Sequence, residues 1–298
     1  MKNSRILMSP PDFFGVHYAI NPWMDPAEWG KDARALAAAS HDQWLELHAV
    51  LSDLGAWIEL MPAAAGLPDL VFTANAAVVM NRKALLARFR FPERRGEEAH
   101  VAATFRALQS RGVIDEIATL PEGVTLEGAG DCVFDRTRSL FWLGYGPRSD
   151  AAAASVVEDT FGLDVVPLEL VDPRFYHMDT ALSVLPCGEV MVVPEAFSAR
   201  GREIIAAHVP AAQRIGIGGS DAEKLCANAV CIGDALVMSS CSERLRAQLC
   251  ERGYRVIATP LTSFLRSGGS AFCLTLRLDL MSARARQSQP LVPAKAGT

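Results

Sequence analysis

The chain has 298 residues, of which 50% are hydrophobic and 21% are charged, so it is able to bury a large core. Its formal net charge of −5 argues against a nucleic-acid-binding protein, and no apolar run reaches the roughly 18 residues of a membrane helix. The seven cysteines include no CxxC pair, which favours reduced thiols in a cytoplasmic protein. We therefore expect no nucleic-acid partner, no membrane contact, no metal and no other cofactor.

Five segments show the apolar spacing of amphipathic helices. The first carries a capping-box pattern that begins at Ser40, and Gly55 ends it. The other four are expected at about residues 97–112, 151–162, 198–209 and 242–249.

A β-rich segment follows each helix, and a pair of strands joined by a short turn comes next. The single strands are expected at 57–60, 114–120, 165–171, 214–217 and 254–258. The pairs are expected at 76–80 with 84–87, 132–134 with 139–143, 181–185 with 189–193, 229–232 with 235–239, and 272–278 with 5–9. A repeat of about 50 residues is typical of propellers and arrays. We predict five ββαβ units closed into a ring within one α/β domain of residues 1–280, followed by a disordered tail at 281–298.

In each predicted unit one residue with reactive or polar chemistry stands where the chain enters the first strand of the pair. These residues are Asn75, Glu127, His177, Asn228 and Cys273. A ring with fivefold pseudosymmetry brings equivalent positions together at its axis, so we expect one shared pocket. Taken singly, each residue also has a structural explanation: His177 fits a core histidine, Glu127 an exposed turn, and Cys273 a buried apolar residue. Their matched positions favour a site.

Cysteine together with histidine is typical of a thiolate nucleophile and its acid–base partner. The carboxylates of Glu127 and Asp179 indicate a cationic substrate, and a guanidinium fits because its planar array of donors pairs with carboxylates. The resonance-stabilised carbon of a guanidinium needs a strong nucleophile such as a thiolate. Expulsion of an amine then needs a general acid, for which His177 is the candidate.

The chain resembles the guanidine-modifying hydrolases of the pentein, or α/β-propeller, superfamily, and most of all arginine dihydrolase and dimethylarginine dimethylaminohydrolase. The likeness extends to about Leu278. It rests on the motifs PDLVFTANA at 68–76, ERRGE at 93–97, EGAGD at 127–131, GPRS at 146–149, FYHMDT at 175–180 and GGSAFCLTL at 268–276. The resemblance implies a fivefold pseudosymmetric α/β-propeller, a small guanidino substrate and a homodimer.

The resemblance also implies roles for particular residues. Cys273 would be the nucleophile, and His177 the general acid and later the base. Glu127 and Asp179 would hold the guanidinium. Arg94 and Arg148 would bind the α-carboxylate of the substrate, and Asn21 would be a further substrate contact.

Asn75 departs from part of the family. Dimethylarginine dimethylaminohydrolases and arginine deiminases carry aspartate there, whereas the dihydrolases have asparagine within the same Thr-Ala-Asn-Ala string. After one hydrolysis the substrate is a neutral urea, and an amide can donate to its oxygen, whereas a carboxylate only accepts. The favoured hypothesis is therefore an arginine dihydrolase, which forms ornithine, carbon dioxide and two ammonia.

Three alternatives to a dihydrolase stay open on the sequence. The first is a dimethylarginine dimethylaminohydrolase, which forms citrulline and dimethylamine. The second is an amidinotransferase, which passes the amidino group to an amine instead of to water. The third is a non-catalytic propeller that binds a partner.

Overall fold

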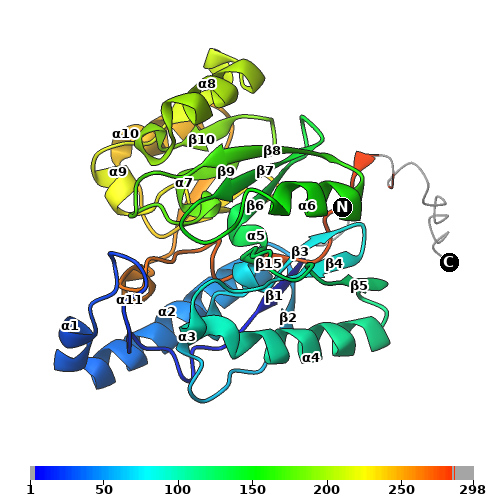
Figure 1. Ribbon diagram of the computed structural model, residues 1–298. Helices are drawn as coiled ribbons and strands as arrows, with labels where there is room; N and C mark the ends of the chain where they lie inside the picture. Colours follow the sequence, from blue (N-terminus) through cyan, green and yellow to red (C-terminus); the bar gives the residue numbers. More distant parts are fainter. Residues whose placement is uncertain (1–3, 284, 286–298) are drawn as a thin grey trace, which may run out of the picture.

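The computed structural model describes residues 4–283 and 285, and within this range the strands form five three-stranded sheets of one design (Figure 1). The middle strand of each sheet pairs antiparallel with one neighbour and parallel with the other. The sheets are β3 (Ala77–Met80), β4 (Lys83–Leu86), β5 (Glu116–Ala118); β6 (Cys132–Asp135), β7 (Leu140–Tyr145), β8 (Asp164–Glu169); β9 (Leu182–Val184), β10 (Val190–Val192), β11 (Arg214–Gly216); β12 (Val230–Ile232), β13 (Ala235–Met238), β14 (Arg255–Ala258); and β15 (Leu276–Arg277), β1 (Arg5–Met8), β2 (Trp57–Leu60).

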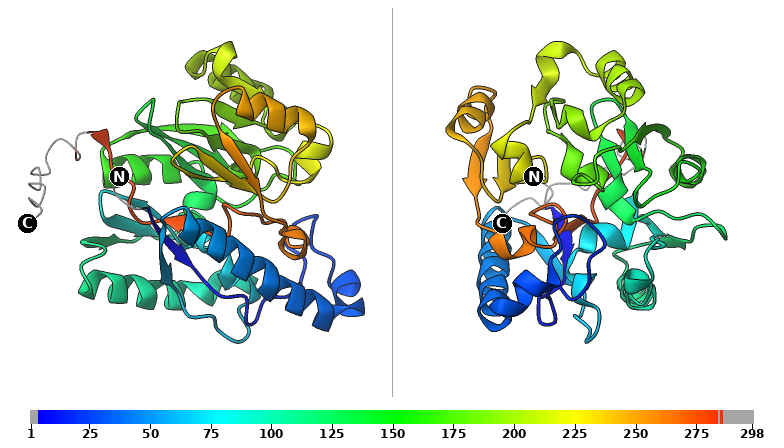
Figure 2. Two further views of the ribbon diagram at one scale, coloured as in Figure 1. Left: turned by 180° about the vertical axis from the view of Figure 1, so that it is seen from behind. Right: turned by 60° about the vertical axis from the view of Figure 1, so that its left-hand side comes forward.

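A helix connects the two parallel strands of every sheet, as a parallel crossover requires. These helices are α4 (Glu97–Ser110), α6 (Ala153–Phe161), α8 (Ala199–His208), α10 (Glu243–Cys250) and α2 (Ala33–Asp53). Figures 1 and 2 show them at the periphery of the molecule, with the strands inside. Shorter helices lie in the connections: α1 (Pro26–Lys31), α3 (Pro92–Arg95), α9 (Ser220–Glu223), α11 (Thr262–Leu265), η1 (Pro68–Val71), η3 (Pro194–Ala196) and η4 (Ala211–Gln213). The predicted ββαβ repeat is confirmed.

The fifth sheet joins the two ends of the described chain. Strand β15 pairs antiparallel with β1, with Ile6 opposite Arg277 and Leu7 opposite Leu276. The predicted pairing of 272–278 with 5–9 is therefore correct in partner, but the strand at the C-terminal end is much shorter than predicted. Residues before it form a turn instead, in which the Leu274 amide donates to the Ser270 carbonyl and the Thr275 amide to the Phe272 carbonyl.

The core lies between each peripheral helix and its sheet. On α4 the apolar residues Val101, Phe105 and Leu108 are buried in one cluster with Ala77 and Val79 of β3. Burying a side chain as large as Phe105 contributes about 1.5–3 kcal/mol. Helix α6 ends as predicted, because Gly162 follows it in the left-handed conformation at φ +64°.

The start of α2 differs from the sequence prediction. The helix begins at Ala33, and the predicted cap residue Ser40 lies inside it, with its hydroxyl donating to the Leu36 carbonyl. The alanine-rich run ahead of Ser40 has high helix propensity and extends the helix in the N-terminal direction. None of the helices in the described ranges is both long and apolar enough to cross a bilayer. The predicted tail at 281–298 lies largely outside the described residues.

Candidate active site

One-turn helices place the predicted polar residues just ahead of the inner strands. The three are η2 (Thr73–Ala76), α5 (Gly128–Asp131) and α7 (Met178–Ala181), which precede β3, β6 and β9. The segments interpreted as loops in the sequence are thus helical turns. Glu127 and His177 are the N-cap residues of α5 and α7. Gly128 is needed there, because a Cβ at this residue would lie 2.6 Å from the Ala74 carbonyl oxygen of the neighbouring unit.

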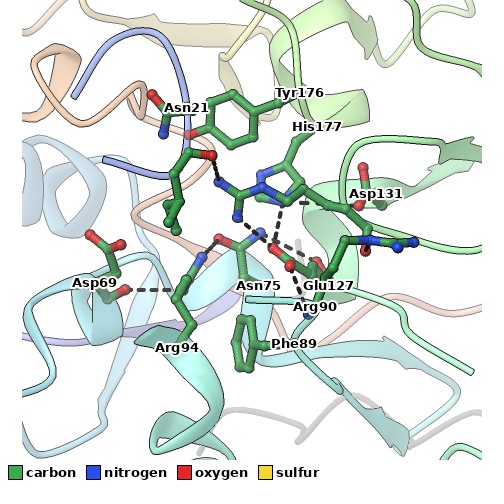
Figure 3. Close-up of polar contacts among 12 residues, drawn as sticks. Asn21, Asp69, Asn75, Phe89, Arg90, Arg94, Glu127, Asp131, Tyr176 and His177 are labelled. Carbon is green, nitrogen blue, oxygen red and sulfur yellow. Dashed lines mark hydrogen bonds and ion pairs between the residues drawn. The ribbon is translucent and has the colours of Figure 1, made fainter. Parts of the chain in front are cut away.

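Glu127 is the centre of a buried charged cluster (Figure 3). Its Oε2 lies 2.9 Å from Nε2 of His177 and 3.0 Å from Nη1 of Arg148. Burial raises the pKa of Glu127, but Arg148 and the hydrogen-bonded His177 outweigh it and lower this pKa to about 2. Glu127 is therefore an anion at neutral pH, and since a carboxylate only accepts, the His177 proton resides on Nε2.

His177 is neutral in this site. Burial lowers the pKa of His177 to about 4, although the Glu127 carboxylate acts in the opposite direction. Its Nδ1 is consequently a basic nitrogen at neutral pH. A neutral imidazole accepts a proton before it can donate one, so the predicted role of general acid would require His177 to act first as a base.

Arg148 is held by two aromatic rings as well as by hydrogen bonds from its nitrogens. The group lies 4.7 Å from the Phe91 ring centroid and 4.6 Å from that of Tyr176, and Nη2 donates to the Ile20 carbonyl. Its side chain is 2% exposed, so Arg148 is a buried arginine. Stacking of this kind fixes the guanidinium plane.

Asp131 supports the same cluster and is buried like Glu127, so the alternative of an exposed turn at Glu127 is wrong. It accepts hydrogen bonds from the Ser149 hydroxyl and from the Met178 amide, at 2.6 and 3.0 Å. Because Met178 follows His177 directly, these bonds tie the backbone of the histidine to the Glu127 unit.

The Cys273 thiol is buried rather than exposed at the mouth of a pocket, since only 2% of the residue is accessible. Its sulfur donates to Asp179 Oδ2 at 3.1 Å and accepts from Asn228 Nδ2 at 3.0 Å. Burial and the facing Asp179 carboxylate raise the pKa of this thiol well above its ordinary value. The Cys273 sulfur thus contacts one hydrogen-bond acceptor, Asp179, and one donor, Asn228.

Asp179 presents an oxygen without a partner. Its Oδ2 accepts from Cys273, whereas Oδ1 is buried and has no hydrogen-bond partner among the described residues. Burial raises the pKa of Asp179 to about 7, although the hydrogen bond from Cys273 acts in the opposite direction. A buried acceptor of this kind is matched by a ligand with N–H donors.

Asn75 and Arg94 lie beside Glu127 (Figure 3). Asn75 donates from Nδ2 to the Glu127 carbonyl at 3.3 Å and accepts at Oδ1 from Nη1 of Arg94 at 2.9 Å. Arg94 also pairs with Glu97 through Nε and Nη2 and donates to the Asp69 carbonyl. Although burial lowers it, the Glu97 carboxylate raises the pKa of Arg94 above its ordinary value. These four bonds leave one N–H of the five on the guanidinium.

Asn21 contacts the segment that precedes Cys273. Its Nδ2 donates to the Ser267 carbonyl at 3.1 Å, and its Oδ1 accepts from the Trp23 amide. The Tyr176 hydroxyl donates to the carbonyls of Ser267 and Gly268. The N-terminal loop and the segment before Cys273 are thus fastened together above the pocket.

The contacts place the predicted residues in two groups: Asn75, Arg94, Arg148 and His177 around Glu127, and Asp179 and Asn228 around Cys273, while Asn21 contacts the segment before Cys273. Asn228 stands at a matched position in the sequence, and in the structure its side chain contacts the Cys273 sulfur. The sequence feature that points to Asn228 is the pair of alanines on either side of it, which also flank Asn75. No three His, Cys, Asp or Glu side chains within residues 4–283 and 285 converge in a way that could hold a metal ion.

Gly130 should be intolerant of a side chain. A Cβ at this residue would meet Asn75 Nδ2 at 2.1 Å, so in the Gly130→Ala variant the Asn75 amide must leave the Glu127 carbonyl. We expect a loss of about 1–3 kcal/mol in the free energy of unfolding, measured by urea denaturation. Gly216→Ala is the control, because a Cβ there has no neighbour within 4 Å. Equal stability of the two variants would contradict the close packing at Gly130.

Residues 18–280 match the family model described as N,N dimethylarginine dimethylhydrolase, eukaryotic. The bifunctional arginine dihydrolase/ornithine cyclodeaminase ArgZ of Synechocystis sp. is 39% identical over 274 residues, covering 92% of this chain and 37% of that protein. The N(G),N(G)-dimethylarginine dimethylaminohydrolase of Mycobacterium tuberculosis is 38% identical over 277 residues, covering 93% of this chain and 86% of that protein.

The same likeness appears in three dimensions. A crystal structure of the N-terminal domain of ArgZ, a cysteine-to-serine mutant bound to its substrate, superposes with a TM-score of 0.86 at 36% identity. The match covers 94% of this chain and 99% of that domain. The chain therefore spans little more than a third of the length of full-length ArgZ and corresponds to its N-terminal domain.

Proposed function

Because the chain belongs to the N,N-dimethylarginine dimethylhydrolase family of guanidine-modifying hydrolases, we propose that it hydrolyses the C–N bonds of the arginine guanidinium in two rounds, as an arginine dihydrolase. The observation that carries the proposal is a buried thiol bonded to one oxygen of the buried Asp179 carboxylate, whose other oxygen has no hydrogen-bond partner among the described residues. A guanidinium bound to Asp179 Oδ1 would place its carbon beside the Cys273 sulfur.

Each predicted residue has a place in this reaction. Cys273 is the nucleophile, Asp179 holds the guanidinium, and His177 moves the protons. Glu127 has both oxygens engaged by Arg148, His177 and the Arg90 amide, so it acts on the substrate chiefly through its charge and its hold on His177. The remaining N–H of Arg94, the guanidinium of Arg148 and the loop of Asn21 face the amino-acid end of arginine.

The first round consumes one water and releases one ammonia. The thiol proton passes to neutral His177, and the Cys273 sulfur forms a bond to the guanidinium carbon. The imidazolium then protonates a terminal nitrogen, the C–N bond breaks, and ammonia leaves. His177 next removes a proton from water, which forms the C–O bond, and the C–S bond breaks. The product is a urea, and the thiol and the neutral imidazole are restored.

The second round, with another water, takes the urea to ornithine, carbon dioxide and ammonia. Asn75 supports this step, because Nδ2 uses one N–H on the Glu127 carbonyl and has a second for the urea oxygen. An aspartate would present only acceptors to both oxygens. Sequence identity does not separate a dihydrolase from a dimethylarginine dimethylaminohydrolase, since the two relatives are 39% and 38% identical. The amide at Asn75 is what favours the dihydrolase.

The Asn75→Asp variant tests this assignment. Purified protein is incubated with arginine and, separately, with asymmetric dimethylarginine, and citrulline, ornithine and dimethylamine are resolved by mass spectrometry. We expect ornithine from the wild-type protein and citrulline as the main product of the variant. The ornithine rate should fall at least about tenfold, since the loss of one hydrogen bond to the reacting group costs about this much.

Asn81→Asp is the matched control for this change, because the side chain of Asn81, in the turn between β3 and β4, bonds Ser282 and none of the predicted site residues. A variant at Asn75 that still makes mainly ornithine would refute the role of the amide. Citrulline and dimethylamine as end products of the wild-type protein would instead establish a dimethylarginine dimethylaminohydrolase, the second candidate that the family model and the mycobacterial relative favour.

The arrangement of the sheets, the domain and the oligomeric state belong to the same proposal. We infer that the five sheets surround a pseudo-fivefold axis as an α/β-propeller, with residues 1–280 as one catalytic domain that needs no cofactor. We propose a homodimer in the cytoplasm, and light scattering of the purified protein is the measurement that checks its mass.

A further inference from the structure

Asn228 is fully buried and touches the sulfur of the nucleophile. Its Nδ2 donates to Cys273 Sγ at 3.0 Å and to the Asp179 carbonyl at 3.2 Å, while its Oδ1 accepts from the Cys273 amide at 3.1 Å. A backbone N–H only donates, so Oδ1 must face the Cys273 amide, and the side-chain nitrogen then faces the sulfur. The orientation of the amide is thereby settled by its partners.

The two neighbours of the sulfur respond in opposite ways to loss of the thiol proton. As a thiol, Cys273 donates to Asp179 Oδ2 and accepts from Asn228. As a thiolate it faces an anionic carboxylate across 3.1 Å, which is unfavourable, whereas the bond from Asn228 becomes charge-assisted and stronger. In the described part of the chain, Asn228 is the side chain whose hydrogen bond to this sulfur gains strength when the proton leaves.

The backbone just before Asn228 adopts an energetically unfavourable conformation. Leu225 has a φ of +51°, a conformation that is unfavourable for a leucine. The carbonyl of Leu225 accepts from the Asn228 amide at 2.9 Å, so this conformation closes the turn that carries Asn228. Unfavourable backbone conformations persist where the surrounding contacts hold them in place, and they are found mainly in functional sites.

We propose that Asn228 is a catalytic residue whose side-chain amide stabilises the Cys273 thiolate as it attacks the substrate carbon. The inference rests on the proposed function, in which Cys273 is the nucleophile. In this step the thiol proton moves to His177, and the sulfur electron pair forms the S–C bond. The electrons of one C–N π bond move onto nitrogen. Asn228 loses no proton and only releases its hydrogen bond as the charge on sulfur disappears.

The test is the pH dependence of Cys273 alkylation by iodoacetamide, a reaction in which the thiolate displaces iodide. Peptide mass spectrometry follows Cys273 and, as an internal control, the exposed Cys187 in the same samples. A hydrogen bond to a charged group corresponds to about one to two pKa units, so the alkylation midpoint of Cys273 should rise by that amount in Asn228→Ala. It should rise further in Asn228→Asp, which replaces the donor with a carboxylate of the same shape.

The Asp179→Asn variant is the matched counterpart on the other side of the sulfur, and its midpoint should fall. With arginine as substrate, kcat of Asn228→Ala should decrease at least about tenfold while KM stays within about threefold, because Asn228 contacts the nucleophile and not the substrate. The Cys187 profile should not change in any variant.

An unchanged Cys273 midpoint in a folded Asn228→Ala protein overturns the proposal. A residue with only a structural role would lower thermal stability and leave that midpoint in place. If the alanine variant does not fold, Asn228→Asp decides by the same measurement. Alkylation needs no substrate, so a wild-type protein that hydrolyses neither arginine nor dimethylarginine would refute the proposed function, while the midpoints would still support or overturn the role of Asn228 at the thiol.

Discussion

The Asp179→Asn variant is expected to be inactive yet more stable than the wild-type protein at pH 8. Asp179 is the residue proposed to hold the guanidinium, and removal of one preorganised charge partner of the reacting group costs about 10²–10³ in kcat. Its stability effect has the opposite sign, because the pKa of Asp179 is raised by burial from 3.8 to about 7 in the folded protein.

The sign of this change in the free energy of unfolding follows from proton linkage. Between pH 4 and 7 the unfolded chain releases a proton that folded Asp179 retains, so the free energy of unfolding falls as pH rises through this window. Asparagine does not titrate and removes this fall. We expect the variant to gain about 1–3 kcal/mol over the wild type at pH 8 and little at pH 4, measured by urea denaturation at both values.

Asp135→Asn provides the matched control for Asp179→Asn. Asp135 is equally buried but is paired with Arg138 and with the indole of Trp142, far from the proposed reaction. This control should lose stability and keep its activity, since a partly buried arginine loses its carboxylate. If Asp179→Asn is less stable than the wild type at pH 8, or if its advantage does not grow with pH, Asp179 is not a strained binding group.

The Glu127→Gln variant should lose both stability and activity. Its carboxylate neutralises Arg148 and holds His177, and both side chains are 2% exposed. Breaking a buried pair by removing one partner costs about 3–5 kcal/mol. Catalysis should fall by about 10²–10³ in kcat, because His177 loses the partner that orients it and stabilises its charged form.

The stability lost in Glu127→Gln should depend on pH. The pKa of Glu127 is lowered from 4.5 to about 2 in the folded protein, because Arg148 and His177 outweigh the opposing effect of burial. Its ionised form therefore stabilises the fold above pH 4.5, and this contribution disappears as pH falls toward 2. The gap between the variant and the wild type should accordingly narrow on acidification.

Glu97→Gln is the control that separates the catalytic role of Glu127 from its structural role. Glu97 is also buried and paired with an arginine, Arg94, but it does not contact His177 in the structure. We expect a similar loss of stability and an activity defect that appears in KM, since Arg94 is proposed to bind substrate. A Glu127→Gln enzyme with kcat within about threefold of the wild type would contradict the role of Glu127.

Much of the architecture was predictable because it depends on local patterns. Alternation of apolar residues predicts strands such as β3 and β4, and helical spacing with a terminal Gly162 predicts α6. Boundaries were less certain. Helix propensity moved the start of α2 from Ser40 to Ala33, and a turn replaced most of the strand predicted after Cys273.

The sequence by itself determined the type and order of the elements, the five repeats, and the set of residues that converge. These follow from periodicity and from equivalent positions in a repeat, which are properties of neighbouring residues. Only the tertiary structure decided the partners and the charge states. Cys273 bonds Asp179 and Asn228, which lie 94 and 45 residues away in the chain. Burial and distance set the strength of such interactions, and both arise only when the units pack against one another.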